Sequence, residues 1–371
     1  MSVNINEMPK LGFGLMRLPE TNGKIDLDEV CRMVDLYMDA GLNYFDTAYV
    51  YHGGKSEVAA KKAIVERYPR DSFKIATKLP AWEMKTEADR DRIFNEQLER
   101  AGVDYYDFYL LHSVENGNID TYERLDCFNW GLQKKAEGKI KHIGFSFHSG
   151  PELLDKILTE HPEAEFVQLQ INYADWENPD VQSRANYEVA RKHGKWITVM
   201  EPVKGGNLAN PPKEVQDLFK AYAPEMSCAS WAIRFVASLD GILTVLSGMS
   251  NIPQMEDNIS YMKDFQPLNA EEREIIRKAQ RILGQSATIP CTACHYCTKG
   301  CPMQIPIPEI FAAQNDLIGN GQTDQAREVY RKLAGAGHVA ADCIGCGQCE
   351  GVCPQHIQII GKLKECAASL E

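Results

Sequence analysis

The sequence predicts an α/β fold in which a closed (β/α)₈ barrel is followed by a small cysteine-rich domain. Up to about residue 283, eight short apolar runs alternate with amphipathic stretches, and beyond it cysteine, proline and glycine dominate. Strands that are covered on both faces are continuously apolar, and eight βα units in about 250 residues are typical of such a barrel. The 371 residues are enough for two domains. We therefore predict a barrel domain over residues 1–283 and a second domain over residues 284–371.

Each apolar run is expected to form one strand of the barrel. In chain order the runs are residues 11–16, 44–48, 73–79, 106–112, 142–147, 166–172, 196–201 and 242–248. An open, doubly wound parallel sheet is the alternative. No Gly-x-Gly-x-x-Gly motif opens a first helix, and this favours the barrel.

The stretches between the runs have the apolar spacing of helices. Helices are expected at residues 28–40, 57–67, 87–101, 122–137, 151–160 and 181–193. Gly41 and Gly102 directly follow two of them, as glycines commonly follow helix ends. A polar helix at residues 270–283 is expected to lead out of the barrel, and another is expected at about residues 323–333.

Composition and charge narrow the classes of function. Hydrophobic residues make up 44% and charged residues 25% of the chain, as in globular proteins with a large core. The formal net charge of −12 argues against general electrostatic binding to nucleic acid or to an anionic membrane. The N-terminal "MSVNINEMPK" lacks the apolar segment of a signal peptide, and no apolar run has the length of a membrane span. We therefore expect a cytoplasmic location, where thiols stay reduced.

Eight of the twelve cysteines lie in two runs with the spacing C-x₂-C-x₂-C-x₃-C-P. In a cytoplasmic protein such clustering favours metal over disulfides, and this spacing is that of bacterial two-[4Fe–4S] ferredoxins. The fourth cysteine of each run ligates the other cluster. We expect cluster one on Cys291, Cys294, Cys297 and Cys353, and cluster two on Cys343, Cys346, Cys349 and Cys301. The second domain is accordingly expected to be a small α+β ferredoxin-like domain. A pair of zinc sites is the alternative, but zinc usually shows two C-x₂-C pairs.

Four polar residues fall where predicted barrel strands end. Asp46 ends the second strand, Tyr51 follows it, Lys78 ends the third strand and His112 ends the fourth. Reactive groups of a (β/α)₈ barrel lie at the carboxyl ends of its strands. Each residue alone is weak evidence, because a strand-ending Asp or Lys is usually a solvated turn residue. Four of them on three successive strands predict a shared site.

These four residue types suit the reduction of a carbonyl group. The reaction needs a hydride on carbon and a proton on oxygen. A tyrosine has an ordinary pKa of about 10, and a neighbouring lysine cation is expected to lower it. An aspartate would pair with the lysine, and a histidine would hydrogen-bond the carbonyl oxygen.

The segments "LGFGLMRLP", "NYFDTAYVYHGGKSE", "IATKLP" and "YLLHS" resemble those of an aldo-keto reductase. The resemblance covers the first domain, and Asp46, Tyr51, Lys78 and His112 match the catalytic tetrad of that family. With its C-terminal cysteines, the chain is similar to bacterial aldo-keto reductases that carry a fused 4Fe–4S ferredoxin domain. The resemblance implies NAD(P)H as the hydride donor and a small carbonyl or alcohol substrate.

The family resemblance also suggests nucleotide contacts. Ser146 and Gln168 stand where family members hold the nicotinamide carboxamide, and Asp257 and Asn258 stand where they hold the adenine. Several positions depart from the family pattern. Phe147 replaces a common Asn, Met200 replaces the aromatic residue that stacks on the nicotinamide, and Gly248 and Gln254 replace the cations of NADPH-selective members. Lys204 is a candidate substitute for those cations, while a weakened grip on the 2′-phosphate is the interpretation that we favour.

A hydride carries two electrons, whereas a [4Fe–4S] cluster normally moves one, and three interpretations remain open. The clusters exchange electrons with an external one-electron carrier, perform a structural or oxygen-sensing role, or are the main functional element of a chain whose barrel docks a nucleotide or partner. We see no separate flavin motif, although a flavin would also link the two kinds of chemistry. The substrate is not identified. Trp82, Asn172, Tyr173 and Trp176 are candidates for shaping its pocket, and packing roles are as plausible for each.

Overall fold

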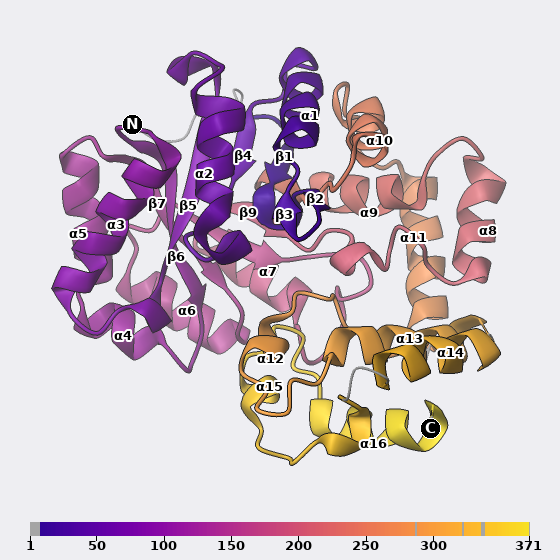
Figure 1. Cartoon of the computed structure of the whole chain (residues 1–371). Helices are drawn as coiled ribbons and strands as arrows, with labels where there is room; N and C mark the ends of the chain where they lie inside the picture. The colour runs from indigo at the N-terminus through magenta and orange to yellow at the C-terminus, as the bar shows by residue number, and fades with distance from the viewer. Residues whose placement is uncertain (1–7, 286–287, 321–322, 335–337, 371) are drawn as a thin grey trace. The chain divides into compact units, whose positions relative to one another are not determined.

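Eight parallel strands form a closed barrel in the computed structural model, which describes residues 8–285, 288–320, 323–334 and 338–370 (Figure 1). Each strand pairs with the barrel strands before and after it in the chain, and β10 pairs with β1. The strands are β1 (Leu11–Gly14), β4 (Tyr44–Asp46), β5 (Lys74–Pro80), β6 (Tyr106–Val114), β7 (Ile140–Phe147), β8 (Phe166–Gln170), β9 (Trp196–Met200) and β10 (Ile242–Ser247). The closure confirms the predicted (β/α)₈ barrel and excludes the open sheet.

The inside of the barrel is a packed core. One buried apolar cluster draws side chains from β4, β5, β6, β8 and β10, with Tyr44, Phe108 and Phe166 as its largest members. A short hairpin of β2 (Glu20–Thr21) and β3 (Lys24–Ile25) follows the first strand, and its Asn22–Gly23 turn has two positive φ angles. Asn-Gly is a strong signal for such a turn. The hairpin was not predicted because its strands are too short to show an alternation of apolar and polar residues.

Most of the predicted helices are found with small changes in their ends, whereas α9 and α10 were not predicted. The α-helices of the barrel are α1 (Leu27–Asp39), α2 (Lys55–Ala60), α3 (Glu87–Ala101), α4 (Ile119–Arg124), α5 (Cys127–Ala136), α6 (Pro151–Glu160), α7 (Ser183–Lys192), α9 (Cys228–Ala237) and α10 (Ile252–Met262). The helix expected at residues 57–67 is α-helical only to Ala60 and continues as a π-helix over Lys61–Val65. The helix expected at residues 122–137 is divided because Asp126 has a φ of 49°. α9 was missed because it is buried from Ser230 to Ala237, so its sequence has no polar face.

The described residues form two compact units. The first consists of residues 8–178, 182–202 and 230–269 and contains the barrel, while the second consists of residues 179–181, 203–229 and the described residues from 270 onward. The second unit therefore includes the segment that follows β9 and begins again before Gly284. The domain boundary near Gly284 stays a prediction, since compactness alone does not test where a domain begins.

Helices build the second unit. They are α8 (Lys213–Tyr222), α11 (Ala270–Leu283), α12 (Tyr296–Lys299), α13 (Ile307–Asn320), α14 (Thr323–Ala334), α15 (Gln348–Gly351) and α16 (Ile359–Leu370). A separate apolar core, with Ile310, Phe311, Tyr330 and Leu363 among its members, lies under the cysteine runs. In the described part of the chain, no helix has the length and apolar character needed to cross a membrane.

The strands of the expected α+β arrangement are not found in the C-terminal domain. The described residues between Thr288 and Leu370 form helices and turns and no strand. Left-handed backbone conformations interrupt both cysteine runs, at Ala293 and His295 in the first and at Gly345 and Gly347 in the second. A β-strand cannot include such residues without a break, so amphipathic helices supply the core instead.

Candidate active site and cysteine pockets

The structure brings the four predicted catalytic residues together at one end of the barrel. Asp46, Lys78 and His112 lie in the neighbouring strands β4, β5 and β6, and Pro80 of β5 pairs with His112. Tyr51 begins the 3₁₀ turn Tyr51–Gly54 that follows β4. Because the strands are parallel, their carboxyl ends meet at the same rim, where barrel enzymes hold their reactive groups.

Lys78 is the centre of this group. Its Nζ is 2.5 Å from Asp46 Oδ1, 2.8 Å from the Thr47 carbonyl oxygen and 3.4 Å from the Tyr51 hydroxyl. An ammonium has three N–H donors, so these three acceptors use its full capacity. The Tyr51 oxygen thus accepts from Lys78, and its own hydrogen is free to point toward a substrate. Lys78 and Asp46 are 1% and 3% exposed, so this ion pair is shielded from water.

Burial sets the protonation of these groups. It lowers the pKa of Lys78 and raises the pKa of Asp46, and the attraction between the two opposes both shifts. Burial also raises the pKa of Tyr51 well above 10, with the carboxylates of Asp46 and Glu201 acting in the same direction. The sequence argument expected Lys78 to lower this pKa. In the structure desolvation dominates, and Arg17 rather than Lys78 is the cation that opposes it, so Tyr51 is a protonated phenol, which is the form that donates a proton.

His112 is neutral and oriented by its strand. Burial lowers its pKa well below 6.5, and the charges of Lys78 and His148 add to the shift. Its ring lies edge-on to Tyr51, with the ring centroids 5.9 Å apart, and Trp82 lies 5.1 Å away on the same measure. Its Nδ1 is buried and has no hydrogen-bond partner among the described residues. A neutral imidazole keeps one N–H, so His112 can donate a hydrogen bond to a carbonyl oxygen.

Ser146 and Gln168 lie beside each other on the same rim. They pair directly between β7 and β8, and both are buried. The Ser146 hydroxyl accepts a hydrogen bond from the Ser113 amide at 2.7 Å. Gln168 Nε2 lies 3.6 Å from Met200 Sδ, while its Oε1 is buried without a partner among the described residues. An orphaned buried amide oxygen needs a donor, and a carboxamide N–H is a suitable one.

The other residues considered for nucleotide binding lie in α10 and in the segment after β9. Asp257 and Asn258 lie in α10, and the Asn258 Oδ1 accepts from the Ser247 hydroxyl at 2.7 Å. Gln254 accepts from the Ser250 amide and is part of the start of α10. Lys204 belongs to the second compact unit, where it is 8% exposed, so the structure does not group it with the others.

The candidates for the substrate pocket divide into two kinds. Asn172 and Tyr173 are buried, and Asn172 Nδ2 donates to Asp175 and to the Glu201 carbonyl oxygen. These contacts give Asn172 a structural role in the loop after β8. Trp82 is 54% exposed and lies beside His112, so it adjoins the predicted catalytic group, whereas Trp176 packs against Tyr187 and Phe235.

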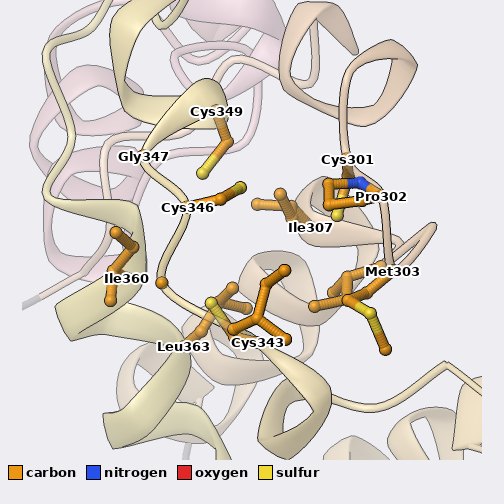
Figure 2. Close-up of a pocket in the computed structure, with 13 residues that line it drawn as sticks. Cys301, Pro302, Met303, Ile307, Cys343, Cys346, Gly347, Cys349, Ile360 and Leu363 are labelled. Carbon is orange, nitrogen blue, oxygen red and sulfur yellow. The ribbon is translucent and has the colours of Figure 1, made fainter.

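The eight motif cysteines line two pockets in the second unit. Cys291, Cys294, Cys297 and Cys353 line one, and Cys301, Cys343, Cys346 and Cys349 line the other (Figure 2). Each pocket therefore combines three cysteines of one run with the last cysteine of the other. Figure 2 shows the side chains of Cys301, Cys343, Cys346 and Cys349 arranged around a common space.

The lining of each pocket suits an iron–sulfur group. Four thiols and mostly apolar side chains surround each one. Within the described ranges, no three His, Cys, Asp or Glu side chains converge as a site for one metal ion would require. Four thiols around an apolar space fit a [4Fe–4S] group in their donor chemistry.

The two pockets differ in their surroundings. Around the first, the segment after β9 supports the cysteine loop: Asn207 Nδ2 donates to the Cys291 carbonyl oxygen at 2.9 Å. A Cβ on Gly205 would lie 2.4 Å from the Thr292 carbonyl oxygen, so only glycine allows this approach. Around the second, Cys346 is exposed and Ile344 is 63% exposed. The second pocket thus borders a neutral, apolar stretch of surface.

Comparison with known proteins decides the family. The model of the Aldo/keto reductase family matches residues 10–281, and that of the 4Fe-4S dicluster domain matches residues 290–358. The chain belongs to the aldo/keto reductase family. It is an oxidoreductase, and the suspected fusion with an iron–sulfur domain is confirmed.

Relatives of this aldo/keto reductase span most of the barrel. L-galactose dehydrogenase of Arabidopsis thaliana is 24% identical in an alignment 298 residues long that covers 74% of this chain and 90% of the relative. The NADH-specific methylglyoxal reductase of Escherichia coli is 23% identical, over 68% of this chain and 89% of its own.

Solved structures share the barrel fold. The holo form of aldo-keto reductase AKR11C1 from Bacillus halodurans has a TM-score of 0.58 at 25% identity, covering 73% of this chain and 92% of its own. An aldo-keto reductase from Klebsiella pneumoniae in complex with NADPH has a TM-score of 0.59 at 20% identity, covering 74% of this chain and 91% of its own.

Two residues at the rim of this reductase were missed by the sequence reasoning. The side chain of Arg17 lies against Gly248, where an added Cβ would be 3.3 Å from Arg17 Cδ, and Arg17 Nη2 is 3.9 Å from Glu201 Oε1. The Tyr122 hydroxyl bonds to the carbonyl oxygens of Leu79 and His112 and accepts from the Ala81 amide, so it ties together the ends of β5 and β6. No local sequence signal marks either contact, because both join segments far apart in the chain.

Proposed function

We propose that the barrel catalyses NAD(P)H-linked interconversion of a carbonyl and an alcohol, and that two [4Fe–4S] clusters exchange electrons with an external one-electron carrier. One observation supports the first half above all. Lys78 donates to both Asp46 and Tyr51 beside a neutral His112, at the carboxyl ends of three successive strands.

Each of the four side chains has a separate role in protonating and orienting the carbonyl oxygen. Tyr51 donates its proton to that oxygen as the alcohol forms, and Lys78 stabilises the phenolate that remains. Asp46 holds Lys78 by a buried ion pair, so the ammonium is in place before the reaction. His112 donates a hydrogen bond that orients the carbonyl. In alcohol oxidation each proton moves in the opposite direction.

Ser146 and Gln168 are the residues that would hold a nicotinamide. The unpartnered Gln168 Oε1 is available to its carboxamide, and Ser146 lies next to it on β7. A bound reduced nicotinamide supplies the hydride for the carbonyl carbon. The NADPH of the Klebsiella pneumoniae structure and the NADH specificity of the Escherichia coli methylglyoxal reductase support this class of cofactor.

The choice between NADH and NADPH depends on cations near the adenosine. Gly248 and Gln254 supply no positive charge, and Gln254 is engaged by the Ser250 amide. Asp257 and Asn258 are the proposed adenine contacts, and Lys204 is a candidate phosphate contact. We propose that NADH binds at least as well as NADPH, since an anionic 2′-phosphate needs a fixed cation.

The two cysteine pockets support the electron-transfer half of the proposal. The pocket of Cys291, Cys294, Cys297 and Cys353 would hold cluster one, and that of Cys301, Cys343, Cys346 and Cys349 would hold cluster two. Each cluster would carry one electron at a time. A purely structural role would need only one metal ion to stabilise a small domain. The exposed Cys346 and Ile344 place the rim of the second pocket where a carrier protein can reach it.

Substitution of Tyr51 by Phe tests the catalytic assignment. The protein is purified anaerobically and assayed with NADH and NADPH against small aldehydes, methylglyoxal and sugars. Tyr51→Phe keeps the ring and removes the proton, so turnover should fall by about 10²–10⁴-fold while nucleotide binding persists. Near-normal turnover of the variant would remove Tyr51 from the mechanism.

A second experiment tests the electron-transfer role. The oxidised clusters of intact protein are followed by electron paramagnetic resonance after NAD(P)H or the alcohol is added, with Tyr51→Phe in parallel. Reduction of the clusters on the timescale of turnover, or a requirement for an added one-electron carrier, supports exchange. Clusters that stay oxidised through many turnovers with no such requirement would make the domain structural or sensory.

A further inference from the structure

Glu57, in the first turn of α2, is a buried carboxylate that the proposed chemistry does not use. It is 0% exposed. Its Oε1 accepts hydrogen bonds from the Thr77 hydroxyl at 2.6 Å and from Gln97 Nε2 at 3.1 Å. Its Oε2 has no hydrogen-bond partner among the described residues and lies 3.7 Å from Arg100 Nη1. An acid buried with one oxygen unsatisfied destabilises a fold, so Glu57 lowers the stability of the barrel where it lies.

The partners of Glu57 lead directly to Lys78. Thr77 is the residue before Lys78 in β5. Gln97, on α3, also directs its Nε2 at the Lys78 carbonyl oxygen and at the Thr77 hydroxyl, both at 3.0 Å. Its Oε1 accepts from the Tyr109 hydroxyl of β6 at 2.6 Å. Glu57 is therefore one end of a buried network that binds the Lys78 carbonyl oxygen and the side chain of the preceding residue, Thr77.

The same turn of α2 also fixes Tyr51. α2 follows the turn Tyr51–Gly54 without an intervening loop. Ser56 lies 2.8 Å from the Thr47 hydroxyl, oxygen to oxygen, and donates to the Leu15 carbonyl oxygen at 3.0 Å. Ser56 thus binds the end of β4, while Glu57 binds β5. These contacts hold the segment that carries Tyr51 against the strand that carries Lys78.

We propose that Glu57 is a positioning residue for the Tyr51–Lys78 pair. Through Thr77 and Gln97 it fixes α2 on β5, and its negative charge keeps Lys78 in the cationic form that supports a phenolate. This inference rests on the proposed function of the barrel and adds a residue that acts through Lys78.

The electrostatics of the network agree with this role. Burial raises the pKa of Glu57 to about 7, and its bonds to Thr77 and Gln97 oppose the shift, as does Arg100. The charge of Glu57 raises the pKa of Lys78, against the larger effect of desolvation. The titratable groups that face Glu57 are Arg100 on α3, Lys78 on β5, and Tyr106 and Tyr109 on β6. Both tyrosines stay neutral because burial holds their pKa values well above 10.

Glu57→Gln is the direct test, because it removes the charge and keeps the shape. Lys78 should then lose its proton at lower pH, so the alkaline limb of the kcat/KM profile should move toward acid by on the order of one pH unit. Thr77→Val loosens the network but keeps the charge, so kcat should fall several-fold without that movement. Glu96→Gln is the matched control. Glu96 is also an Arg100 partner, at 3.3 Å, but its other hydrogen bonds are to Tyr49 and Arg92 and it is about one-third exposed.

A second measurement does not depend on turnover. In protein labelled with ¹⁵N-lysine, the Lys78 Nζ signal, assigned by its loss in Lys78→Arg, is followed against pH. It should shift as Glu57 ionises in the wild type and in Glu96→Gln, but not in Glu57→Gln. Superimposable Nζ titrations and superimposable pH profiles for wild type and Glu57→Gln would overturn the inference. If no carbonyl compound is reduced at all, the proposed function fails, and the Nζ titration still decides whether Glu57 controls the charge of Lys78.

Discussion

The barrel site and the cysteine pockets are built in opposite ways. At the barrel rim, Lys78 is already bonded to Asp46, Thr47 and Tyr51, so the protein itself supplies the geometry. The cysteines instead surround open space, and the contacts of their sulfurs are weaker, as at Cys291, where the Ala293 amide lies 3.5 Å from Sγ. The first site is organised without its cofactor. The second consists of donors arranged for a group that would complete it.

The largest expected effect lies at the buried ion pair. Lys78→Met leaves Asp46 charged and without its partner, so stability should fall by about 3–5 kcal/mol. Turnover should fall by at least the 10²–10⁴-fold expected for loss of an acid–base group. Denaturant unfolding and steady-state kinetics measure the two effects. Lys141→Met is the control, because that lysine is half exposed and its buried partner Asp107 keeps a second cation, Arg70. Wild-type turnover in Lys78→Met would contradict the view that the barrel site is organised around Lys78.

Glu57 gives the barrel a dependence of stability on pH. Its pKa is about 7 in the folded protein and about 4.5 when exposed, so folding favours the protonated form. The contribution of Glu57 to the free energy of unfolding is fully present below pH 4.5 and is lost as the pH rises through 7. The loss amounts to about 3 kcal/mol, from about 1.4 kcal/mol per pKa unit. Urea unfolding of the barrel at pH 5 and pH 8 should show this loss in the wild type and not in Glu57→Gln. Equal losses in both would assign the dependence to other groups.

Crossed ligation can be tested by counting iron. Cys297→Ser and Cys353→Ser combined remove two ligands of the proposed cluster one, so iron should fall from about eight to about four atoms per chain. If each run held its own cluster, the same pair would damage both clusters and remove nearly all the iron. Cys31→Ser, outside both motifs, should leave the iron content unchanged. Turnover of a carbonyl by the barrel should be less affected than by Lys78→Met.

The smallest expected effect concerns the nucleotide. NADH should bind to the anaerobic protein at least as well as NADPH, with affinities within about tenfold, or about 1.4 kcal/mol, because Gly248 and Gln254 offer the 2′-phosphate no cation. Fluorescence titration with both nucleotides measures the ratio, and Arg17→Met shows whether the cation beside Gly248 contributes to it. A hundredfold preference for NADPH would mean that a cation of this chain binds the 2′-phosphate firmly.

The pattern of apolar residues was sufficient to predict the barrel, and the positions of polar residues at strand ends were sufficient to choose the candidate catalytic residues. The continuously apolar strands report burial on both faces, and the residue that ends such a strand must lie at the rim, which identifies Lys78 and His112. Glu57 was not found, because a glutamate near Lys55 and Lys61 looks like part of a solvated helix face. Only the approach of Thr77 and Gln97, distant in sequence, buries it. Lys204 shows the same limit, since its grouping with the second unit depends on tertiary contacts.

The chain passes back and forth between its compact units, and this affects any attempt to separate them. Residues 203–229 leave the barrel after β9 and return to it at α9. Deleting residues 284–371 would take away the carbonyl group that Asn207 binds and the backbone on which Gly205 rests. The iron–sulfur segment is therefore not a removable module, and a barrel obtained by a single cut would have an altered loop directly after one of its eight strands. Grafting the segment onto another barrel would need the loop to be transferred with it.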